Sequence, residues 1–266
     1  MIASQRGVPM NRFAVNLETW WRGLPLLERI DQAARAGFTT AEMWGLSEGE
    51  RDPATLKRLS SDAGLYIAHC TVSVPKLVSA SVREFRDEVS ASLDKITALG
   101  ARYGTIVGHK NVDGMTKADM LSAYQDRLAD AAPLFEAAGV VATIEPFNPF
   151  NHPGFFLYGA DDAVRICREI GSPNMKINWD LFHMQRHEGN LVTRLREGID
   201  QCGLLQIADS PDRREPGTGE LDYSYIIGEA FKLGFAGHLG LECFPDKGEE
   251  SVAVERVRTM AASIAP

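Results

Sequence analysis

The chain has few cysteines, no long hydrophobic run and no signal-like N-terminus, and each absence excludes a class of protein. Its four cysteines (Cys70, Cys167, Cys202 and Cys243) are widely spaced and form no C-x-x-C pair, so we expect free thiols in a reducing compartment. No apolar run approaches the ~20 residues that a membrane-spanning helix needs. The opening MIASQRGVP lacks the apolar segment of a secretory signal. We therefore expect a cytoplasmic protein that does not interact with membranes.

Basic residues are also in the minority. The chain carries 28 Lys and Arg against 36 Asp and Glu, which gives a formal net charge of −8 and a pI near 5.3. Sequence-independent binding to nucleic acids depends on neutralising phosphates with Lys and Arg. Because no Lys/Arg run is present, we do not expect a nucleic-acid partner.

The length and composition are typical of one globular domain. The chain has 266 residues, of which 44% are hydrophobic and 24% charged, and a (β/α)8 barrel typically has about 250 residues. The segment MNRFAVNL suggests that the fold begins near Met10. We expect residues 1–9 to be a leader without fixed structure and residues 10–266 to form a single domain.

One unit recurs along the chain: an amphipathic stretch, a break that contains glycine, and a short apolar run. Helical patterns cover Leu26–Ala36, Val82–Leu99 and Ala118–Ala138. A glycine just past a helix is expected because it adopts positive φ without steric cost. The breaks are AGF (36–38), AGL (63–65), LGA (99–101), AGV (138–140), IGS (170–172), CGL (202–204) and LGF (233–235).

The apolar runs predict eight strands that alternate with helices. Such alternation implies parallel strands joined by crossover helices. Eight strands in one short chain favour a closed (β/α)8 TIM barrel over an open doubly wound sheet. The runs are 13–17, 39–44 (TTAEMW), 66–72 (YIAHCTV), 102–109 (RYGTIVGH), 140–147 (VVATIEPF), 174–180 (NMKINWD), 204–209 (LLQIAD) and 237–243 (GHLGLEC).

Acidic and amide side chains stand at the ends of the last four runs. The fifth run delivers Glu145, the sixth Asp180, the seventh Gln206 and Asp209, and the eighth Glu242. The carboxyl ends of barrel strands form the face that carries active sites. Ion pairs with separate Arg or Lys side chains would satisfy one such acid, but several converging carboxylates require a shared cation. Oxygen ligands suit a hard divalent ion such as Mg²⁺ or Mn²⁺.

Histidines and tryptophans supply further candidates near the same face. His183 follows Asp180 by three residues, which favours a loop or first helical turn beside the site. His69 and His109 lie on the third and fourth runs, where a substrate-binding and a structural role are equally compatible with the sequence. Tryptophans after the first two runs are candidates for an apolar wall of the pocket: Trp20, Trp21 and Trp44.

Several segments resemble the hydroxypyruvate isomerase family of the xylose-isomerase-like TIM barrels. The matching segments, in chain order, are IEPFN (144–148), PGFFL (153–157), GSPNMK (171–176), WDLFHMQ (179–185), QIAD (206–209), RREPGTGE (213–220) and LEC (241–243). The resemblance implies that Glu145, Asp180, Gln206 and Glu242 hold one metal ion, that Glu145 and Glu242 are the acid–base pair, and that His183 and Arg213 contact the substrate. An ion pair of Arg213 with Glu215 or Glu220 is the structural alternative.

The chain departs from the family in loops that face the substrate. Trp179 and Phe182 replace the tyrosines of the family's sixth-strand motif, and FNPFNH (147–152) replaces its usual Asn-Thr-Arg pattern. These departures bear on the substrate rather than on the metal chemistry. We expect a small hydroxy-carbonyl compound or sugar acid, isomerised by proton transfer through an enediolate. A homo-oligomer is compatible with the sequence.

Three alternatives stay open. A ketose 3-epimerase would use the same residues and return the proton to the same carbon. An AP endonuclease would use His69, His109, Glu145, Asp180 and His183 for several metal ions, although Gln206 stands where a further histidine is needed. A non-catalytic sugar-binding barrel would bind metal without exchanging a substrate proton.

Overall fold

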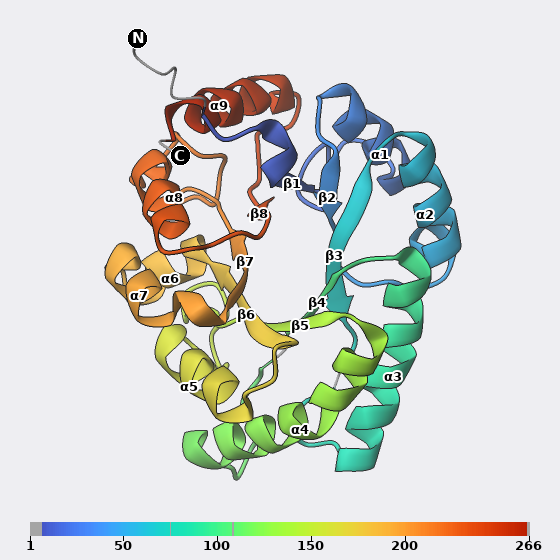
Figure 1. The fold of residues 1–266 in the computed structure, drawn as a ribbon, viewed down its shortest axis with the longest axis vertical. Coiled ribbons are helices and arrows are strands. Elements are labelled where there is room, and N and C mark those ends of the chain that lie inside the picture. The colour runs from blue at the N-terminus through green and yellow to red at the C-terminus, as the bar shows by residue number, and fades with distance from the viewer. Residues whose placement is uncertain (1–6, 75, 108, 265–266) are drawn as a thin grey trace.

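A closed barrel of parallel strands forms the centre of the computed structural model, which describes residues 7–264 except 75 and 108. The strands pair in sequence order and β8 pairs with β1, so no edge is left open (Figure 1). The predicted (β/α)8 TIM barrel is therefore confirmed. The strands are β1 (Phe13–Asn16), β2 (Thr40–Glu42), β3 (Tyr66–Val72), β4 (Tyr103–Ile106), β5 (Val141–Ile144), β6 (Met175–Asp180), β7 (Cys202–Gln206) and β8 (Leu239–Leu241).

Helices form the outer ring in Figure 1 and cover the barrel on all sides. Each connection between successive strands contains one α-helix, except that two helices join β6 to β7. The described helices are α1 (Leu26–Arg35), α2 (Pro53–Asp62), α3 (Val82–Leu99), α4 (Lys117–Ala138), α5 (Ala160–Ile170), α6 (Leu181–His187), α7 (Leu191–Gly198), α8 (Tyr223–Lys232) and α9 (Glu250–Ser263), with short 3-10 turns η1 (Met10–Arg12), η2 (Gly49–Arg51) and η3 (Ile199–Gln201).

Helix α3 has its predicted bounds, and α4 begins one residue before its prediction and ends where predicted. Ser81 and Glu84 form a reciprocal capping box at the start of α3, which satisfies backbone N–H groups that have no partner in the helix. Thr116 and Asp119 do the same for α4. Both helices end in a left-handed glycine, at Gly100 and Gly139. Capping at both ends thus sets where α3 and α4 begin and end.

One expected break was wrong. The segment CGL at 202–204 does not end a helix, because Cys202 and Gly203 already lie in β7. A Cβ at Gly203 would stand 2.8 Å from Lys176 Cβ on β6, so the glycine permits close strand packing. The helix before this strand instead ends at Gly198.

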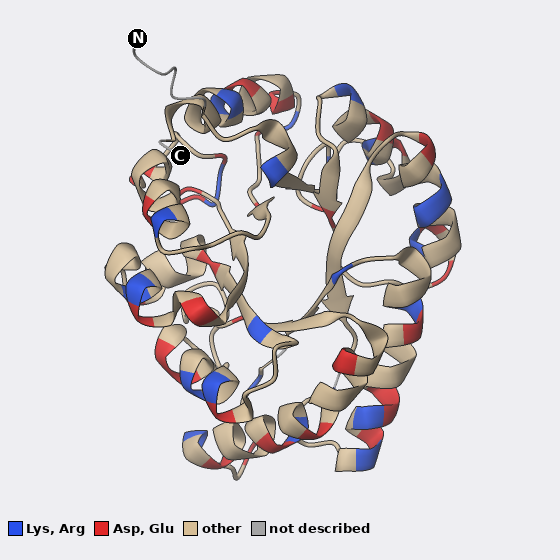
Figure 2. Ribbon diagram, in the orientation of Figure 1, with Lys and Arg blue, Asp and Glu red and all other residues tan. Residues whose placement is uncertain are grey.

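The polar surface lies on the outer helices. Figure 2 shows basic and acidic residues interspersed along this ring, whereas the strands are mostly uncharged. Within the described residues, no helix is both long and apolar enough to cross a membrane. Of the expected leader at 1–9, residues 1–6 lie outside the described residues, and the Val8 N–H donates to Ala261 O of α9 at 2.8 Å.

Candidate active site

The polar residues predicted at the strand ends meet at one end of the barrel. Asp180 and Gln206 are the last residues of β6 and β7, while Glu145 and Glu242 directly follow β5 and β8. All four side chains are buried. Strands β5 and β8 end before the expected runs do, so each glutamate is the first residue after its strand.

Glu145, Gln206 and Glu242 line a cavity of about 380 Å³ at the carboxyl ends of the strands, and Asp180 contacts Arg213 of the same lining. A larger hollow of about 690 Å³ lies at the opposite end, where β4, β5 and β7 begin, and among the acids only Asp200 lines it. The smaller cavity is therefore the candidate active site, as its position in a (β/α)8 barrel also indicates. It is lined by Trp44, His69, Thr71, Val107, Glu145, Phe147, His152, His183, Gln206, Arg213, Glu242 and Phe244.

Arg213 places a positive charge between two of the acids. Its Nη2 donates to Asp180 Oδ2 at 2.9 Å and to Glu242 Oε2 at 3.2 Å. Among the described residues, Arg213 forms no ion pair with Glu215 or Glu220: Glu215 contacts Arg256 and Arg214, and Glu220 Oε1 accepts from Gln185 Nε2. Arg213 has φ of +58°, a strained conformation for a non-glycine residue. The ion pairs of Arg213 with Asp180 and Glu242 therefore offset the backbone strain of its positive φ.

Burial makes these carboxyl groups reluctant to ionise. The pKa of Glu242 is raised to about 7, chiefly by burial; Arg213 opposes this rise, and the neighbouring Glu42 and Asp180 add to it. Burial also raises the pKa of Glu145 well above its ordinary value, helped by the charges of Glu242 and Asp180. Carboxyl groups with a pKa closer to neutrality are better suited to accept and return protons near pH 7.

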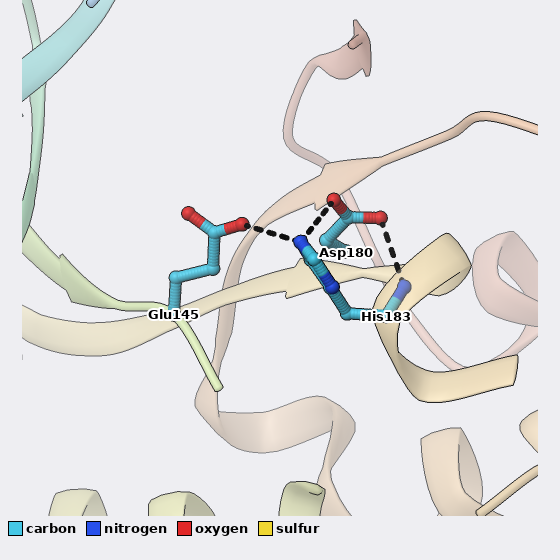
Figure 3. Close-up of side chains that lie close together, drawn as sticks. All are labelled: Glu145, Asp180 and His183. Carbon is cyan, nitrogen blue, oxygen red and sulfur yellow. Dashed lines mark hydrogen bonds and ion pairs between the residues drawn. The ribbon is translucent and has the colours of Figure 1, made fainter. Parts of the chain in front are cut away.

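His183 stands between Glu145 and Asp180, as Figure 3 shows. It is the third residue of α6, and its Nε2 lies 3.8 Å from Glu145 Oε1 and 3.6 Å from Asp180 Oδ2. Asp180 also caps α6, since its Oδ1 accepts from the Phe182 N–H at 2.8 Å. Burial, followed by the charge of Arg213, lowers the pKa of His183 well below its usual value, so the ring is neutral. Glu145, Asp180 and His183 thus offer three atoms within 4.8 Å of one another.

A belt of hydrogen-bonded polar side chains, one from each of β1 to β7, supports the site. Its centre is Glu42 on β2, a buried acid that the sequence reasoning missed. Glu42 Oε1 accepts from Asn16 Nδ2 at 3.0 Å and from Gln206 Nε2 at 2.9 Å. Gln206 Oε1 in turn accepts from Asn178 Nδ2 at 2.7 Å. The polar belt comprises Asn16, Glu42, His69, Thr105, Thr143, Asn178 and Gln206.

The other candidate histidines differ in where they lie. His69 lines the cavity and also belongs to the polar belt, with Nε2 2.6 Å from Thr105 Oγ1. His109 does not line the cavity. Its ring is enclosed by Tyr124, Phe147 and Phe156, its Nε2 lies 3.0 Å from the Tyr124 hydroxyl, and burial lowers its pKa to about 3. This environment indicates a packing role.

Of Asp209, Trp20 and Trp44, only Trp44 lines the cavity. Asp209 Oδ2 accepts from the N–H groups of Gly217, Thr218 and Gly219, so it organises the loop that carries Arg213. Trp44 lines the cavity and its Nε1 donates to Glu242 Oε1 at 2.8 Å. Trp20 is fully buried away from the cavity lining, with its Nε1 bonded to Leu241 O.

An aromatic wall on the β5 side was also missed. Phe147 and His152 stack with ring centroids 4.1 Å apart and an interplanar angle of 17°, and both line the cavity. They belong to the FNPFNH segment (147–152) in which the chain departs from the pattern it resembles. Phe244 completes an apolar lining that suits the C–H surface of a small polyol or sugar acid.

Comparison with protein families gives one match over most of the chain. Residues 30–263 match the model of the xylose isomerase-like TIM barrel. The chain is 30% identical to the hydroxypyruvate isomerase of Escherichia coli (strain K12), over 91% of this chain and 96% of that protein. It is 32% identical to the 2-oxo-tetronate isomerase of Cupriavidus necator, over 90% of this chain and 95% of that protein.

Solved structures share the same architecture. The structure titled AP endonuclease, family 2 from Brucella melitensis superposes with a TM-score of 0.83 at 29% identity, covering 91% of this chain and 97% of that chain. An L-ribulose 3-epimerase superposes with a TM-score of 0.74 at 22% identity, over 95% of this chain and 91% of that chain, which establishes the shared fold alone.

Proposed function

The chain belongs to the xylose isomerase-like TIM barrel family, and on its homology to hydroxypyruvate and 2-oxo-tetronate isomerases we propose the reaction that it catalyses as an isomerase. It interconverts a small hydroxy-carbonyl compound, of the hydroxypyruvate and tartronate semialdehyde type or a related sugar acid. The reaction is a proton transfer through an enediolate. One divalent metal ion, Mg²⁺ or Mn²⁺, assists it.

The observation that carries this proposal is the convergence of three buried carboxyl groups on one small cavity. Glu145 and Glu242 line it, and Asp180 lies behind them, in contact with Arg213 and close to Glu145. Among the described residues, Arg213 is the only Arg or Lys that lines the cavity. Uncompensated buried carboxylates are costly. The excess of acid over base therefore favours a further cation at this place.

The donor set fits a hard divalent cation. Glu145, Asp180, Gln206 and Glu242 would hold it, because they offer carboxylate and amide oxygens from four successive strands. The orientation of the Gln206 amide supports this assignment, since its Nε2 donates to Glu42, and its Oε1, which accepts one hydrogen bond from Asn178, has a second lone pair for a cation. When bound, such an ion supplies Lewis-acid stabilisation of the negative charge that develops on adjacent substrate oxygens.

The chain's own residues move the proton. One carboxylate of the pair Glu145 and Glu242 removes the proton from the carbon beside the carbonyl, and the other returns a proton. Their raised pKa values suit both halves of this exchange. Arg213 offsets negative charge on the substrate carboxylate or the enediolate, and the cavity's aromatic lining limits access of water.

The carbon that receives the proton decides the type of reaction. Return to the neighbouring carbon interconverts an aldose-type and a ketose-type compound, whereas return to the opposite face of the same carbon is an epimerisation. A ketose 3-epimerase is therefore the alternative on the same residues. The homology to hydroxypyruvate and 2-oxo-tetronate isomerases favours isomerisation.

Product analysis with metal-stripped protein tests the proposal. The protein is treated with chelator, reloaded with Mg²⁺ or Mn²⁺, and incubated with hydroxypyruvate, 2-oxo-tetronate and a set of ketoses. We expect metal-dependent formation of an isomer from one of the keto acids. A C3 epimer of a ketose as the main product would favour the epimerase, and metal-independent turnover would refute the metal's role. Incision of an abasic-site duplex tests the endonuclease alternative.

A further inference from the structure

Asn148, a fully buried residue in the loop after β5, has a side-chain amide whose orientation is fixed by the backbone. Its Oδ1 lies 3.0 Å from the Phe150 N and 2.9 Å from the Asn151 N. Backbone N–H groups only donate hydrogen bonds, so the atom facing them must be the amide oxygen. The amide nitrogen, Nδ2, therefore faces the other way, toward His183 Nδ1 at 2.7 Å.

This contact determines which nitrogen of His183 carries the proton. Because the Asn148 Nδ2 donates, the His183 Nδ1 must accept and cannot itself bear hydrogen. A neutral imidazole has one N–H, which is then on Nε2. Two donors would face each other at 2.7 Å in the other tautomer, as they would in an imidazolium.

The Nε2–H group points into the cavity and has no hydrogen-bond partner in the protein. His183 is fully buried, and its Nε2 stands 3.8 Å and 3.6 Å from the nearest oxygens of Glu145 and Asp180, beyond hydrogen-bonding distance (Figure 3). An unsatisfied buried donor is costly unless a ligand completes it. A nitrogen that carries hydrogen has no lone pair to offer a metal ion, although His183 lies within the three-atom cluster with Glu145 and Asp180.

We propose that Asn148 is a positioning residue that holds His183 as an Nε2–H donor to a substrate oxygen and thereby keeps it out of the metal's ligand set. The acceptor is a carbonyl, hydroxyl or enediolate oxygen bound between Glu145 and Asp180. This proposal rests on the proposed isomerase reaction for the identity of the acceptor, whereas the tautomer follows from the contacts of Asn148 alone.

Asn148→Asp reverses the hydrogen bond with little change of shape. The new carboxylate still accepts from the Phe150 and Asn151 N–H groups, so the turn is retained. Its second oxygen now requires a donor, which places hydrogen on His183 Nδ1. We expect kcat to fall by roughly 10²–10⁴, the scale on which a wrong histidine tautomer impairs catalysis. The Kd for Mn²⁺ should stay within about threefold, a change of under 1 kcal/mol. Asn151→Asp, an exposed residue in the same loop, is the control for the added charge.

Histidine ¹⁵N NMR reads the tautomer without any substrate. In the wild type, with and without Mg²⁺, we expect the His183 hydrogen on Nε2, and in Asn148→Asp on Nδ1 or on both nitrogens. A wild-type ring protonated on Nδ1, or loss of the Nε2 proton on adding Mg²⁺, would overturn the proposal even if the variant fails to fold. So would unchanged turnover in a folded Asn148→Asp protein. An inactive wild type with hydrogen on Nε2 would instead count against the proposed reaction.

Discussion

Gln206 Nε2 donates to Glu42 Oε1 at 2.9 Å, which ties the end of β7 to the end of β2 across the barrel. A carboxylate only accepts hydrogen bonds, so Glu42 determines which end of the Gln206 amide is nitrogen. The amide oxygen is consequently the acceptor end: it accepts from Asn178 Nδ2 at 2.7 Å and has a second lone pair for another partner. Orientation of this kind, by a neighbour of a metal ligand, is commonly needed for tight metal binding.

Replacing Glu42 by Met should weaken metal binding without touching a proposed ligand. The thioether fills a similar volume but cannot accept from Gln206 or Asn16, so the Gln206 amide loses its fixed orientation. We expect the Kd for Mn²⁺, measured by calorimetry, to rise about 10- to 100-fold. Unchanged affinity in a folded Glu42→Met protein would show that Gln206 needs no such support.

Gly240 on β8 makes the space that Glu42 occupies. A Cβ at this position would overlap the Glu42 carboxylate and stand 2.8 Å from Gln206 Cγ, both of which are buried. Gly240→Ala should therefore lower the free energy of unfolding by about 1–3 kcal/mol, as overpacking of a core does, and weaken Mn²⁺ binding in parallel. Gly23→Ala is the matched control, because its new Cβ meets only the flexible end of Lys247. Equal stability of the two variants in denaturant titrations would contradict this role.

Removal of Arg213 should tighten metal binding while it slows the reaction. The Arg213 Nη2 contacts the oxygens of Asp180 and Glu242 that a metal ion would use, and it adds a like charge beside the ion. We expect Arg213→Met to lower the Kd for Mn²⁺ by about tenfold, or 1.4 kcal/mol, and to lower kcat. Arg214→Met is the control, since Arg214 pairs with Asp246 at 2.6 Å. Weaker Mn²⁺ binding in Arg213→Met would show that Arg213 supports the metal.

The stability of the chelator-treated protein should decline as pH rises. Burial raises the pKa of Glu145 and Glu242 in the folded state, to about 7 for Glu242, from a value of 4.5. Stability from such groups is present below the unfolded-state pKa and is lost as pH rises through the folded-state pKa. We expect Tm to fall between pH 5 and 7.5, with a smaller fall in Glu242→Gln.

Metal addition should reverse this decline. At 100 times its Kd an ion that binds only the folded state stabilises by about 2.7 kcal/mol, which corresponds to a rise in Tm of roughly 5–11 °C. The rise should be larger at pH 7.5 than at pH 5, where protons compete for the carboxylates. A Tm that is independent of Mn²⁺ at both values of pH would contradict the metal site.

The fold was predictable because its signals are local and repeated. The recurring glycines after helices, each followed by an apolar run, predict the barrel. Only the CGL break was wrong, because by sequence alone a glycine within a strand cannot be told from one that ends a helix. The acids at the ends of β5 to β8 were found because they interrupt apolar runs. Glu42 interrupts the second run in the same way, so the same criterion applied to every strand would have found it.

Other parts of the site depend on contacts that no local pattern encodes. The bond between Asn148 and His183 joins residues 35 positions apart, and the stacking of Phe147 on His152 depends on the path of an irregular loop. Arg213 lines the cavity and has a positive φ, whereas its neighbour Arg214 pairs with Asp246, and neither feature has a local sequence signal. Such features follow from how loops pack over the barrel rather than from composition or periodicity.

Proton NMR in D2O with Mg²⁺ is the most direct test of the proposed proton transfer. The wild-type protein should replace one substrate C–H proton by deuterium as product forms, and chelator should stop the exchange. Glu145→Gln and Glu242→Gln, each with wild-type circular dichroism, should form no product and exchange the C–H proton far more slowly, because one carboxylate of the pair must remove a proton and the other must return one. Exchange at the wild-type rate in a folded Glu242→Gln protein would contradict the assignment of Glu242 to the acid–base pair, and exchange that persists with chelator would contradict the role of the metal.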